Sequence, residues 1–518
     1  MSRRGNIFQS SQEVRRPSNA FNLSHDLKTS FKLGQLIPTL VLETLPGDKF
    51  TISVESLTKF MPLVSPAMQK FNITHHLFFV PNRLVWDDWD DFIGGNGSFT
   101  TPVLNGLSGL QVGDLGEYMG LPLSMDADEE ISAIPFAGYS LIYDEYYSDN
   151  RLYTDSFQPL AEGTSGANST YESYALGVPF IRAWAHDYFT SCLPYPQEGS
   201  SSVAVPTTGS GTDPYVRLLN TSSDQKLENS SGTPLTSGTL TTDASGQLQV
   251  GGVDAWLDPQ YSLQANIAND KSDISDLRRA IKLQEFLEKD GRGGFRYTET
   301  IYKHFGVRSK DARLDRPEYI GGSKGNIAVS EVLSSAETRE FDSDDIISPI
   351  GSFAGHGVGV TGGNTFKYYS EEWGTIICIT SVLPDASYSQ GIHKLWSRTD
   401  RLDWYWHEFA NIGEQAVKVR EIFAEGTVSQ NDEDFGYIPR YSEYKFLQNR
   451  ITGLMKTDLD HWHLGRQFAS KPTLNDALIQ CIPDTRIFAD ETGHQIVAHI
   501  YFNIQAYRQM PMFANPSI

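Results

Sequence analysis

The sequence predicts a mainly β protein with a few helices, and three observations support this prediction. Apolar and polar residues alternate from Phe71 to Phe79 and again from Ile496 to Ala506, and a proline follows each run. This period of two is typical of strands with one buried face. The run 373–383 (WGTIICITSVL) is dominated by apolar residues, as expected of a strand buried on both faces. The 24 Tyr and 28 Phe residues also favour strands, because flat rings pack well on a pleated sheet.

Helical spacing is clear in only one segment. Ile274, Leu277 and Ile281 follow Ser272 at intervals of three and four residues, and Gly291 closes the segment, so we predict a helix there. A second, shorter helix is predicted within 174–189, and residues 415–423 form another short strand candidate. The predicted strands are separated by unusually long connections.

Composition and cysteine usage bound the class of protein. A chain of 518 residues with 39% hydrophobic residues is globular, and folding hides roughly three quarters of its extended surface. The three cysteines, Cys192, Cys378 and Cys481, are far apart and odd in number, which excludes a disulfide framework and favours a reducing compartment. No secretory signal begins the sequence and no run of 18 apolar residues occurs. We therefore expect that the protein is made in a cytoplasm and does not insert into a membrane.

Charge is distributed unevenly along the chain. The formal net charge is −22, yet residues 1–37 carry six cations and two anions, so this stretch is +4 and the rest is −26. We predict that 1–37 is a basic N-terminal arm whose cations contact nucleic-acid phosphates, in a salt-sensitive and sequence-independent way. The alternative is that a polar terminus carries these charges by chance. The predicted DNA-contacting residues are Arg3, Arg4, Arg15, Arg16, Lys28 and Lys32.

The segment 199–252 has the most unusual composition. Of its 54 residues 27 are Gly, Ser or Thr, and only six are charged. It is either a flexible linker between domains or an ordered surface excursion whose strands pack with like copies. Leu235, Thr239, Leu240 and Leu248, spaced at intervals, favour the excursion.

Two short glycine motifs invite a catalytic interpretation that their context does not support. Residues 357–362 satisfy GxGxxG, but an apolar strand follows instead of the helix that a dinucleotide site requires, so we predict a glycine-rich loop. Residues 321–325 satisfy GxSxG, but a strand-like segment follows instead of the helix of a nucleophile elbow. We predict no catalytic site at either motif.

Histidines and acidic clusters have similarly plain interpretations. His461 and His463, beside Asp458 and Asp460, offer at most two metal ligands from one strand face, so we predict ordinary core or interface histidines and no metal or cofactor. Residues 86–91 (WDDWDD) place four carboxylates beside two indoles. A glycosidase needs an acid and a base facing each other across a cleft, which adjacent carboxylates do not provide.

Tryptophan and tyrosine are favoured anchors at protein interfaces. The tryptophans of 86–91 and of 396–406 are therefore candidates for contacts between subunits, with ordinary core packing as the alternative. The predicted subunit-interface residues are Trp86, Trp89, Trp396, Trp404 and Trp406.

Several long sequence blocks occur in order along most of the chain. They are 31–38 (FKLGQLIP), 43–50 (ETLPGDKF), 62–68 (PLVSPAM), 75–86 (HHLFFVPNRLVW), 296–299 (RYTE), 305–307 (FGV), 313–322 (RLDRPEYIGG) and 436–444 (GYIPRYSEY). With these blocks the chain resembles the major capsid proteins, of the VP1 or F type, of the gokushovirus branch of the Microviridae. Ordered blocks of this length are far more specific than the short motifs above.

The resemblance implies a structural protein of a bacteriophage virion and no enzyme. It implies an eight-stranded viral jelly-roll barrel with long inter-strand insertions, assembled as a T=1 icosahedral shell around circular single-stranded DNA in the bacterial cytoplasm. The partners implied are further copies of the chain, the genomic DNA, a small basic DNA-binding protein, a pilot protein, a scaffolding protein and a host surface receptor. In that family a variable insertion builds protrusions at the threefold axes that are thought to meet the host.

The segment 197–262 resembles that insertion, and its predicted host-facing residues are Thr207, Thr212, Thr221, Thr233, Thr239 and Thr242. In this division 1–37 is an inward-facing arm, and 38–196 and 263–518 form the shell wall. Two other classes remain open from the residues alone. One is a carbohydrate-binding or glycoside-hydrolysing β-protein; the other is a single-stranded-DNA-binding protein, which the overall negative charge disfavours.

Overall fold

The computed structural model describes residues 18–149, 151–152, 157–163, 167–197, 274–294, 296–308, 310–335, 338–339, 346–348 and 351–513. Between 227 and 257 it describes only short strands. The chain divides into two compact units, one of residues 1–198 with 288–518 and one of residues 199–287. The second unit thus takes in most of the segment 197–262 expected as a surface insertion, and it continues to Leu287.

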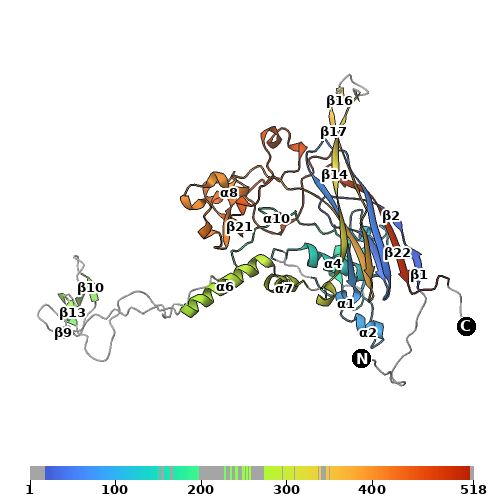
Figure 1. Ribbon diagram of the computed structural model, residues 1–518, viewed down its shortest axis with the longest axis horizontal. Helices are drawn as coiled ribbons and strands as arrows, with labels where there is room; N and C mark the ends of the chain where they lie inside the picture. Colours follow the sequence, from blue (N-terminus) through green and yellow to red (C-terminus); the bar gives the residue numbers. More distant parts are fainter. Residues whose placement is uncertain are drawn as a thin grey trace. The chain divides into compact units, whose positions relative to one another are not determined.

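The largest sheet of the first unit is antiparallel and has ten strands, and it curls into a half-barrel (Figure 1). Eight strands follow one another across it: β1 (Asn19–Asn22), β22 (Ile496–Arg508), β4 (Lys49–Phe60), β17 (Phe353–Thr361), β14 (Glu318–Leu333), β5 (Phe71–Pro81), β19 (Gly374–Pro384) and β3 (Ile37–Thr44). Outside this path, β2 (His25–Phe31) pairs with β22 and β18 (Thr365–Tyr369) pairs with β4. The mainly β, jelly-roll prediction is confirmed.

The strongest strand predictions match strands of the sheet. The two alternating runs are β5 and β22, and the apolar run is β19, in which every residue is buried. The predicted strand at 415–423 is only partly correct, because β20 (Glu414–Lys418) gives way to the short helix α8 (Val419–Ile422). The backbone N–H of Lys418 donates to Oε1 of Glu421 at 3.0 Å, and this bond caps the start of α8.

Two long connections carry most of the remaining elements. The connection from β5 to β14 contains α1 (Asn82–Val85), α2 (Trp89–Gly94), β6 (Val103–Leu104), α3 (Leu115–Tyr118), β7 (Ile131–Ser132), α4 (Ile134–Ile142), α5 (Ser169–Ala175), α6 (Ile274–Gly293) and α7 (Tyr297–Phe305). The connection from β19 to β22 contains β20, α8, α9 (Val428–Asn431), β21 (Asp434–Pro439) and α10 (Asp476–Ile479). The short pair β15 (Thr338–Arg339) and β16 (Ile346–Ser348) lies between β14 and β17. The expected long inter-strand insertions are therefore present.

The described strands of the second unit form two small antiparallel sheets. One is β10 (Leu240–Thr242), β11 (Leu248–Val250) and β12 (Val253–Asp254), and the other is β13 (Trp256–Leu257), β8 (Leu227–Glu228) and β9 (Pro234–Leu235). Short paired strands therefore occur within this segment, and its assignment as a surface excursion stays a prediction.

One helix prediction is confirmed and the other is wrong. The helix predicted after Ser272 is α6. The helix predicted within 174–189 is absent from that segment apart from the last residues of α5, which ends at Ala175. Gly177 closes this helix with a bond from its N–H to the carbonyl of Tyr174, and Pro179 lacks the N–H that a continuing helix needs.

Part of the segment predicted as an N-terminal arm belongs to the sheet instead. Residues 19–31 form β1 and β2, which pair with β22 over eleven residue pairs, and Ile37 begins β3. Phe31 is buried in the barrel core and Leu27 packs against it, so apolar burial holds this stretch on the sheet. The sequence analysis weighed the basic charges of this stretch and did not recognise its apolar residues as those of a strand. Residues 1–17 lie outside the described residues.

Two apolar cores lie on opposite faces of the central strands. Phe71, Leu77 and Phe79 of β5 face the barrel core with the inward residues of β4 and β22. The intervening Phe78 and Val80 face a second core beneath α4. Figure 1 shows α1 and α4 against one end of the sheet. Both faces of β5 and β19 are therefore covered.

The GxGxxG segment is a strand and not the predicted loop. Gly355, Gly357 and Gly359 lie in β17 between β4 and β14, where a Cβ at each position would meet a neighbour at less than 3 Å. The glycines therefore allow close strand packing, and they do not form a phosphate-binding loop. The GxSxG segment likewise lies within β14, with Ser323 buried.

We predict that Gly357→Ala lowers the free energy of unfolding by about 1–3 kcal/mol, the usual cost of overpacking. Its Cβ would lie 2.3 Å from Cδ2 of the buried Phe60. Gly362→Ala is the matched control from the same motif, because its Cβ would meet only the movable Cγ of exposed Glu55 at 3.3 Å. Urea denaturation of unassembled subunits measures both. Equal midpoints for the two variants would contradict the packing explanation.

A buried histidine lies in the barrel among hydroxyl groups. His75 Nε2 lies 2.9 Å from Ser56 Oγ and its Nδ1 lies 2.8 Å from Thr380 Oγ1. Burial, helped by the neighbouring His76, lowers the pKa of His75 from 6.5 to about 4. The imidazole is therefore neutral in the folded chain at neutral pH.

We predict that the subunit loses stability as the pH falls from 6.5 towards 4. In that window His75 binds a proton in the unfolded chain but stays neutral in the folded chain. Acid therefore lowers the free energy of unfolding, by up to about 3 kcal/mol. His75→Gln should flatten the pH profile of the unfolding free energy, even if its absolute stability is lower. His25→Gln, at an exposed histidine of β2, is the control. An unchanged slope in His75→Gln would show that this histidine is not responsible.

Candidate assembly surfaces

Among the described residues, a large group of exposed aromatic side chains lies in the second long connection. Trp396 is 76% exposed and Leu447 is 79% exposed, and ring contacts join the two segments to which they belong. The Tyr405 ring lies 4.8 Å from that of Tyr441 and 6.1 Å from that of Tyr444. We call this surface the aromatic patch; its exposed apolar members are Ile392, Leu395, Trp396, Leu402, Trp404, Tyr405, Tyr444, Phe446 and Leu447.

Buried polar contacts hold the aromatic patch in place. Arg398 forms an ion pair with Glu443 at 3.3 Å, with both side chains almost fully buried, and its guanidinium lies 4.4 Å from the centre of the Tyr444 ring. The backbone N–H of Trp406 donates to the hydroxyl of Tyr441 at 3.2 Å. The patch is thus fixed within the subunit and presents apolar area without needing a partner to order it, which lowers the entropic cost of association.

An apolar surface of this kind is unusual for a protein that works alone. Monomeric soluble proteins rarely expose large contiguous apolar patches, and those that occur are commonly interaction sites. Each square ångström removed from water contributes about 25 cal/mol. The patch is therefore a strong candidate for a contact between subunits.

The tryptophans predicted as interface residues divide into three groups. Trp396 and Trp404 are exposed members of the patch, and Trp406 lies beside them, partly buried. Trp89 is half-buried against other rings. Trp86 is 0% exposed in the second core, so it cannot contact another subunit and that assignment is corrected. Residue type alone did not distinguish a ring beneath α4 from one at the surface.

The sequence-based search missed part of the patch. Tyr444, Phe446 and Leu447 are exposed, although the prediction had considered only tryptophans. The run YKFL at 444–447 was a usable signal, because three large apolar residues occur there without the alternation of a strand.

The acidic cluster at 86–91 has a local structural role. Asp90 and Asp91 lie in the first turn of α2, where carboxylates interact favourably with the helix dipole. Asp91 Oδ1 also accepts a hydrogen bond from Asn96 Nδ2 at 3.0 Å. This arrangement does not face an acid against a base, so it gives no support to glycoside hydrolysis.

Three of the predicted DNA-contacting residues and host-facing threonines lie in the described part of the chain. Lys28 lies exposed on β2 and forms an ion pair with Asp26, and Lys32 is exposed just after β2. Thr242 ends β10. Arg3, Arg4, Arg15, Arg16, Thr207, Thr212, Thr221, Thr233 and Thr239 lie outside the described residues.

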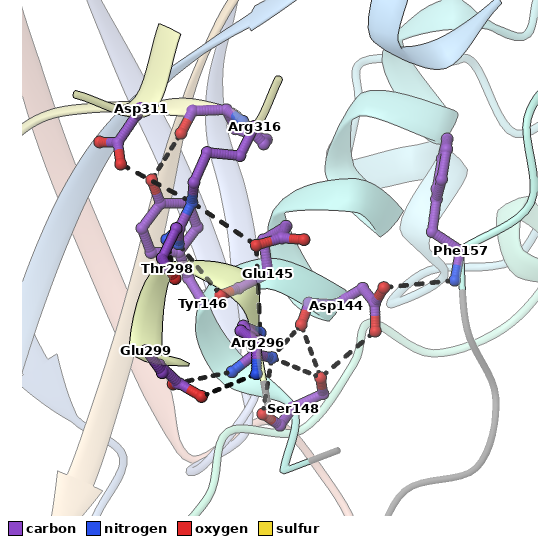
Figure 2. Close-up of polar contacts among 11 residues, drawn as sticks. Asp144, Glu145, Tyr146, Ser148, Phe157, Arg296, Thr298, Glu299, Asp311 and Arg316 are labelled. Carbon is purple, nitrogen blue, oxygen red and sulfur yellow. Dashed lines mark hydrogen bonds and ion pairs between the residues drawn. The ribbon is translucent and has the colours of Figure 1, made fainter. Parts of the chain in front are cut away.

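Two arginines anchor the chain where it returns towards the sheet at α7. Figure 2 shows Arg296 at the start of this helix, with its backbone N–H donating to Oε2 of Glu299 at 3.1 Å. The Arg296 guanidinium donates to the carbonyl oxygens of Asp144 and Ser148, the latter at 3.1 Å. These bonds fasten α7 to the turn that follows α4.

Arg316 makes the second anchor, just before β14. Its Nη1 donates to Thr298 Oγ1 at 3.1 Å, and its guanidinium lies 4.4 Å from the centre of the Tyr146 ring (Figure 2). Its Nε lies 3.5 Å from Oε2 of Glu145. The blocks 296–299 and 313–322, which carry part of the family resemblance, thus hold the long connection against the barrel.

Within the described part of the chain, no three His, Cys, Asp or Glu side chains are grouped as a metal site. His461 and His463 are partly buried and buried, and Nε2 of His463 lies 2.7 Å from the carbonyl oxygen of Met455. The three cysteines are unpaired and buried. Among the described helices, none has the length and apolar character needed to cross a membrane.

Comparison with known proteins gives consistent matches over the whole chain. The sequence profile of the phage family described as "Capsid protein (F protein)" matches residues 8–518. The capsid protein VP1 of Chlamydia phage 1 is 32% identical, over 98% of this chain and 96% of that protein. The capsid proteins VP1 of Bdellovibrio phage phiMH2K and Spiroplasma virus 4 are 31% and 30% identical, over 98% and 97% of this chain and 97% and 95% of theirs.

These matches confirm the resemblance drawn from the ordered sequence blocks. They also agree with a jelly-roll sheet whose long connections carry exposed apolar surface. The chain therefore belongs to the capsid protein (F protein) family of Microviridae-type phages, and it is a structural protein of the virion and not an enzyme.

Proposed function

We propose that copies of this chain assemble, in the cytoplasm of a bacterial host, into a closed T=1 icosahedral shell that encloses single-stranded DNA. The aromatic patch is the observation that carries this proposal. It presents a fixed apolar surface, with Trp396 and Leu447 as its most exposed members. A subunit of a permanent shell must bury large obligate interfaces, commonly thousands of square ångströms, and such interfaces are rich in aromatic residues.

Charge supports a role for basic helpers in packaging. The net charge of −22 opposes close approach of DNA to most of the surface. Arg3, Arg4, Arg15 and Arg16 concentrate positive charge at the N-terminus, and we propose that they contact the genome from the inner side of the shell. Four arginines neutralise little of a genome, so a small basic DNA-binding protein is an expected partner, with pilot and scaffolding proteins.

The second unit is the proposed host-facing part. Its segment 199–252 is poor in charge and rich in Gly, Ser and Thr, and short paired strands lie within it. Copies of such strands from neighbouring subunits can pack together, which fits protrusions at threefold axes. We propose that these protrusions meet a host surface receptor, with Thr242 and the other predicted threonines among the host-facing residues.

The first experiment tests shell formation through the aromatic patch. Trp396→Asp should abolish closed particles, because a charge would replace an exposed ring in an interface that excludes water. Trp396→Phe is the matched control and should assemble, since it keeps an apolar ring. Negative-stain microscopy and mass photometry of material co-expressed with the phage's companion genes provide the readout, and nuclease-protected DNA reports packaging.

Either of two results would count against this proposal. Wild-type chains that remain monomers with all companion proteins present would refute the shell itself. Trp396→Asp particles indistinguishable from wild type would remove the patch from the subunit contacts.

A second experiment tests the host-facing role of the insertion. Replacement of 199–252 by a short Gly-Ser linker should leave shells intact but lower adsorption to host cells at least tenfold, because the proposed receptor contact is removed. Replacement of the exposed loop 126–130 by Gly-Ser of equal length is the control and should adsorb normally. Normal adsorption by the shortened variant would exclude the insertion as the attachment surface.

A further inference from the structure

A cleft outside the aromatic patch has a composition that the shell role does not require. It has a volume of about 460 Å³ and lies where β5 and β14 meet the segment 182–186. This volume falls within the range of about 300–1,000 Å³ that is common for small-ligand pockets. The residues that decide its chemistry are His76, Tyr147, Arg182, Tyr319, Lys324 and Asp385.

Arg182 places a positive charge at the cleft with donors to spare. Its Nη1 donates to Thr74 Oγ1 at 2.6 Å and to Ser381 Oγ at 2.8 Å, and its guanidinium lies 5.7 Å from the centre of the Tyr147 ring. None of the ion pairs found among the described residues includes Arg182. Two hydroxyls orient this guanidinium without neutralising it, and its Nη2 and Nε are left to donate to an anion.

The remaining charges of the cleft also favour an anion. Lys324 adds an exposed ammonium, while burial, with the nearby Arg182, lowers the pKa of His76 to about 4 and keeps that ring neutral. Asp385 is the one carboxylate among the lining residues, and its Oδ1 already accepts from Asn72 Nδ2 at 3.0 Å. A second cavity shares Tyr146 and Tyr147 with this one, and its lining includes three further arginines and two carboxylates, Asp149 and Glu299. Two of these arginines already form ion pairs, Arg292 with Glu414 and Arg296 with Glu299. On a chain with 64 acidic and 42 basic residues, cations outnumber anions along this cleft.

An aromatic ring stands beside this anion site. Tyr319 is 46% exposed, and its ring lies 5.9 Å from that of His76 in an edge-to-face arrangement. A β-bulge between Tyr319 and Gly321 interrupts the pairing of β14 with β5. Bulges re-aim side chains beside functional sites, and this one lies at the rim of the cleft.

We infer that this cleft binds one nucleotide unit of single-stranded DNA, with Arg182 and Lys324 on the phosphate and Tyr319 stacked on the base. A positively charged groove with exposed aromatic rings is the usual chemistry for single-stranded nucleic acid. A carbohydrate would not need the unneutralised guanidinium, and a metal ion would be repelled by it. The inference rests on the proposed function in one respect, that the shell holds single-stranded DNA; it adds a site that the N-terminal arginines do not supply.

The test is fluorescence anisotropy of a labelled ten-residue oligodeoxythymidylate with the full-length, unassembled chain. Arg182→Gln should weaken binding at least tenfold and reduce the slope of log K against log salt by about 0.7, the value for one lost phosphate contact. Tyr319→Ala should weaken binding roughly fivefold to a hundredfold through lost stacking, and Tyr319→Phe should restore it. Tyr319 is half exposed, so this variant stays informative even if Arg182→Gln folds poorly.

Arg313→Gln is the matched control, because it removes the same charge from an exposed arginine outside the cleft. Thymidine monophosphate and inorganic phosphate, used as competitors, separate recognition of a whole nucleotide from recognition of its phosphate alone. Competition by the nucleotide at lower concentration than by phosphate supports the inference. Equal competition, or an equal loss of binding in Arg313→Gln and Arg182→Gln, overturns it.

Particles of the same variants separate this inference from the proposed function. Closed shells from wild type, Arg182→Gln and Tyr319→Ala, with unchanged oligonucleotide binding, would overturn the cleft and leave the shell proposal standing. Wild-type chains that bind the oligonucleotide through Arg182 but form no shells would overturn the shell proposal and leave the cleft standing.

Discussion

The burial of β5 and β19 on both faces is the constraint on which the rest of the subunit depends. Ile376 and Cys378 of β19 face the barrel core, and the alternate Ile377 and Ile379 face the core beneath α4. One side of each strand belongs to each core, so the two cores are built on the same pair of strands. Gly138 of α4 lies against both strands, since a Cβ there would be in van der Waals contact with Ile377 and Val80.

The same two strands set where function is placed. The two long connections begin at the ends of β5 and β19, so the long insertions of the chain leave from two of its most buried strands. Arg296 and Arg316 then return the first connection to the barrel through fixed hydrogen bonds and an aromatic contact. A rigid wall with anchored excursions is what a shell protein needs, because surface segments can change without disturbing the sheet.

Polar groups inside this framework have distinct roles. The ion pair of Arg398 with Glu443 is closed on itself and stiffens the aromatic patch. Arg182 has no such acidic partner among the described residues, and the hydroxyls of Thr74 and Ser381 orient it instead. A buried charge without a counter-charge costs free energy, and function is a common reason for a protein to retain one. This contrast separates the cleft from the structural ion pairs around it.

The sequence by itself determined the strands β5, β19 and β22, the helix α6 and the capsid family, because periodic burial and long ordered blocks are written directly in residue order. It could not place Trp86 in a core or read β17 as a strand, since both depend on which distant residues lie opposite. Gly357 faces Phe60, and Trp86 lies beneath α4, only after the sheet has paired. The cleft around Arg182 likewise joins β5, β14 and β19, so its chemistry exists only in the folded chain. The alternation of apolar and polar residues shows which face of a single strand is buried. Only tertiary packing decides which distant residues that face contacts.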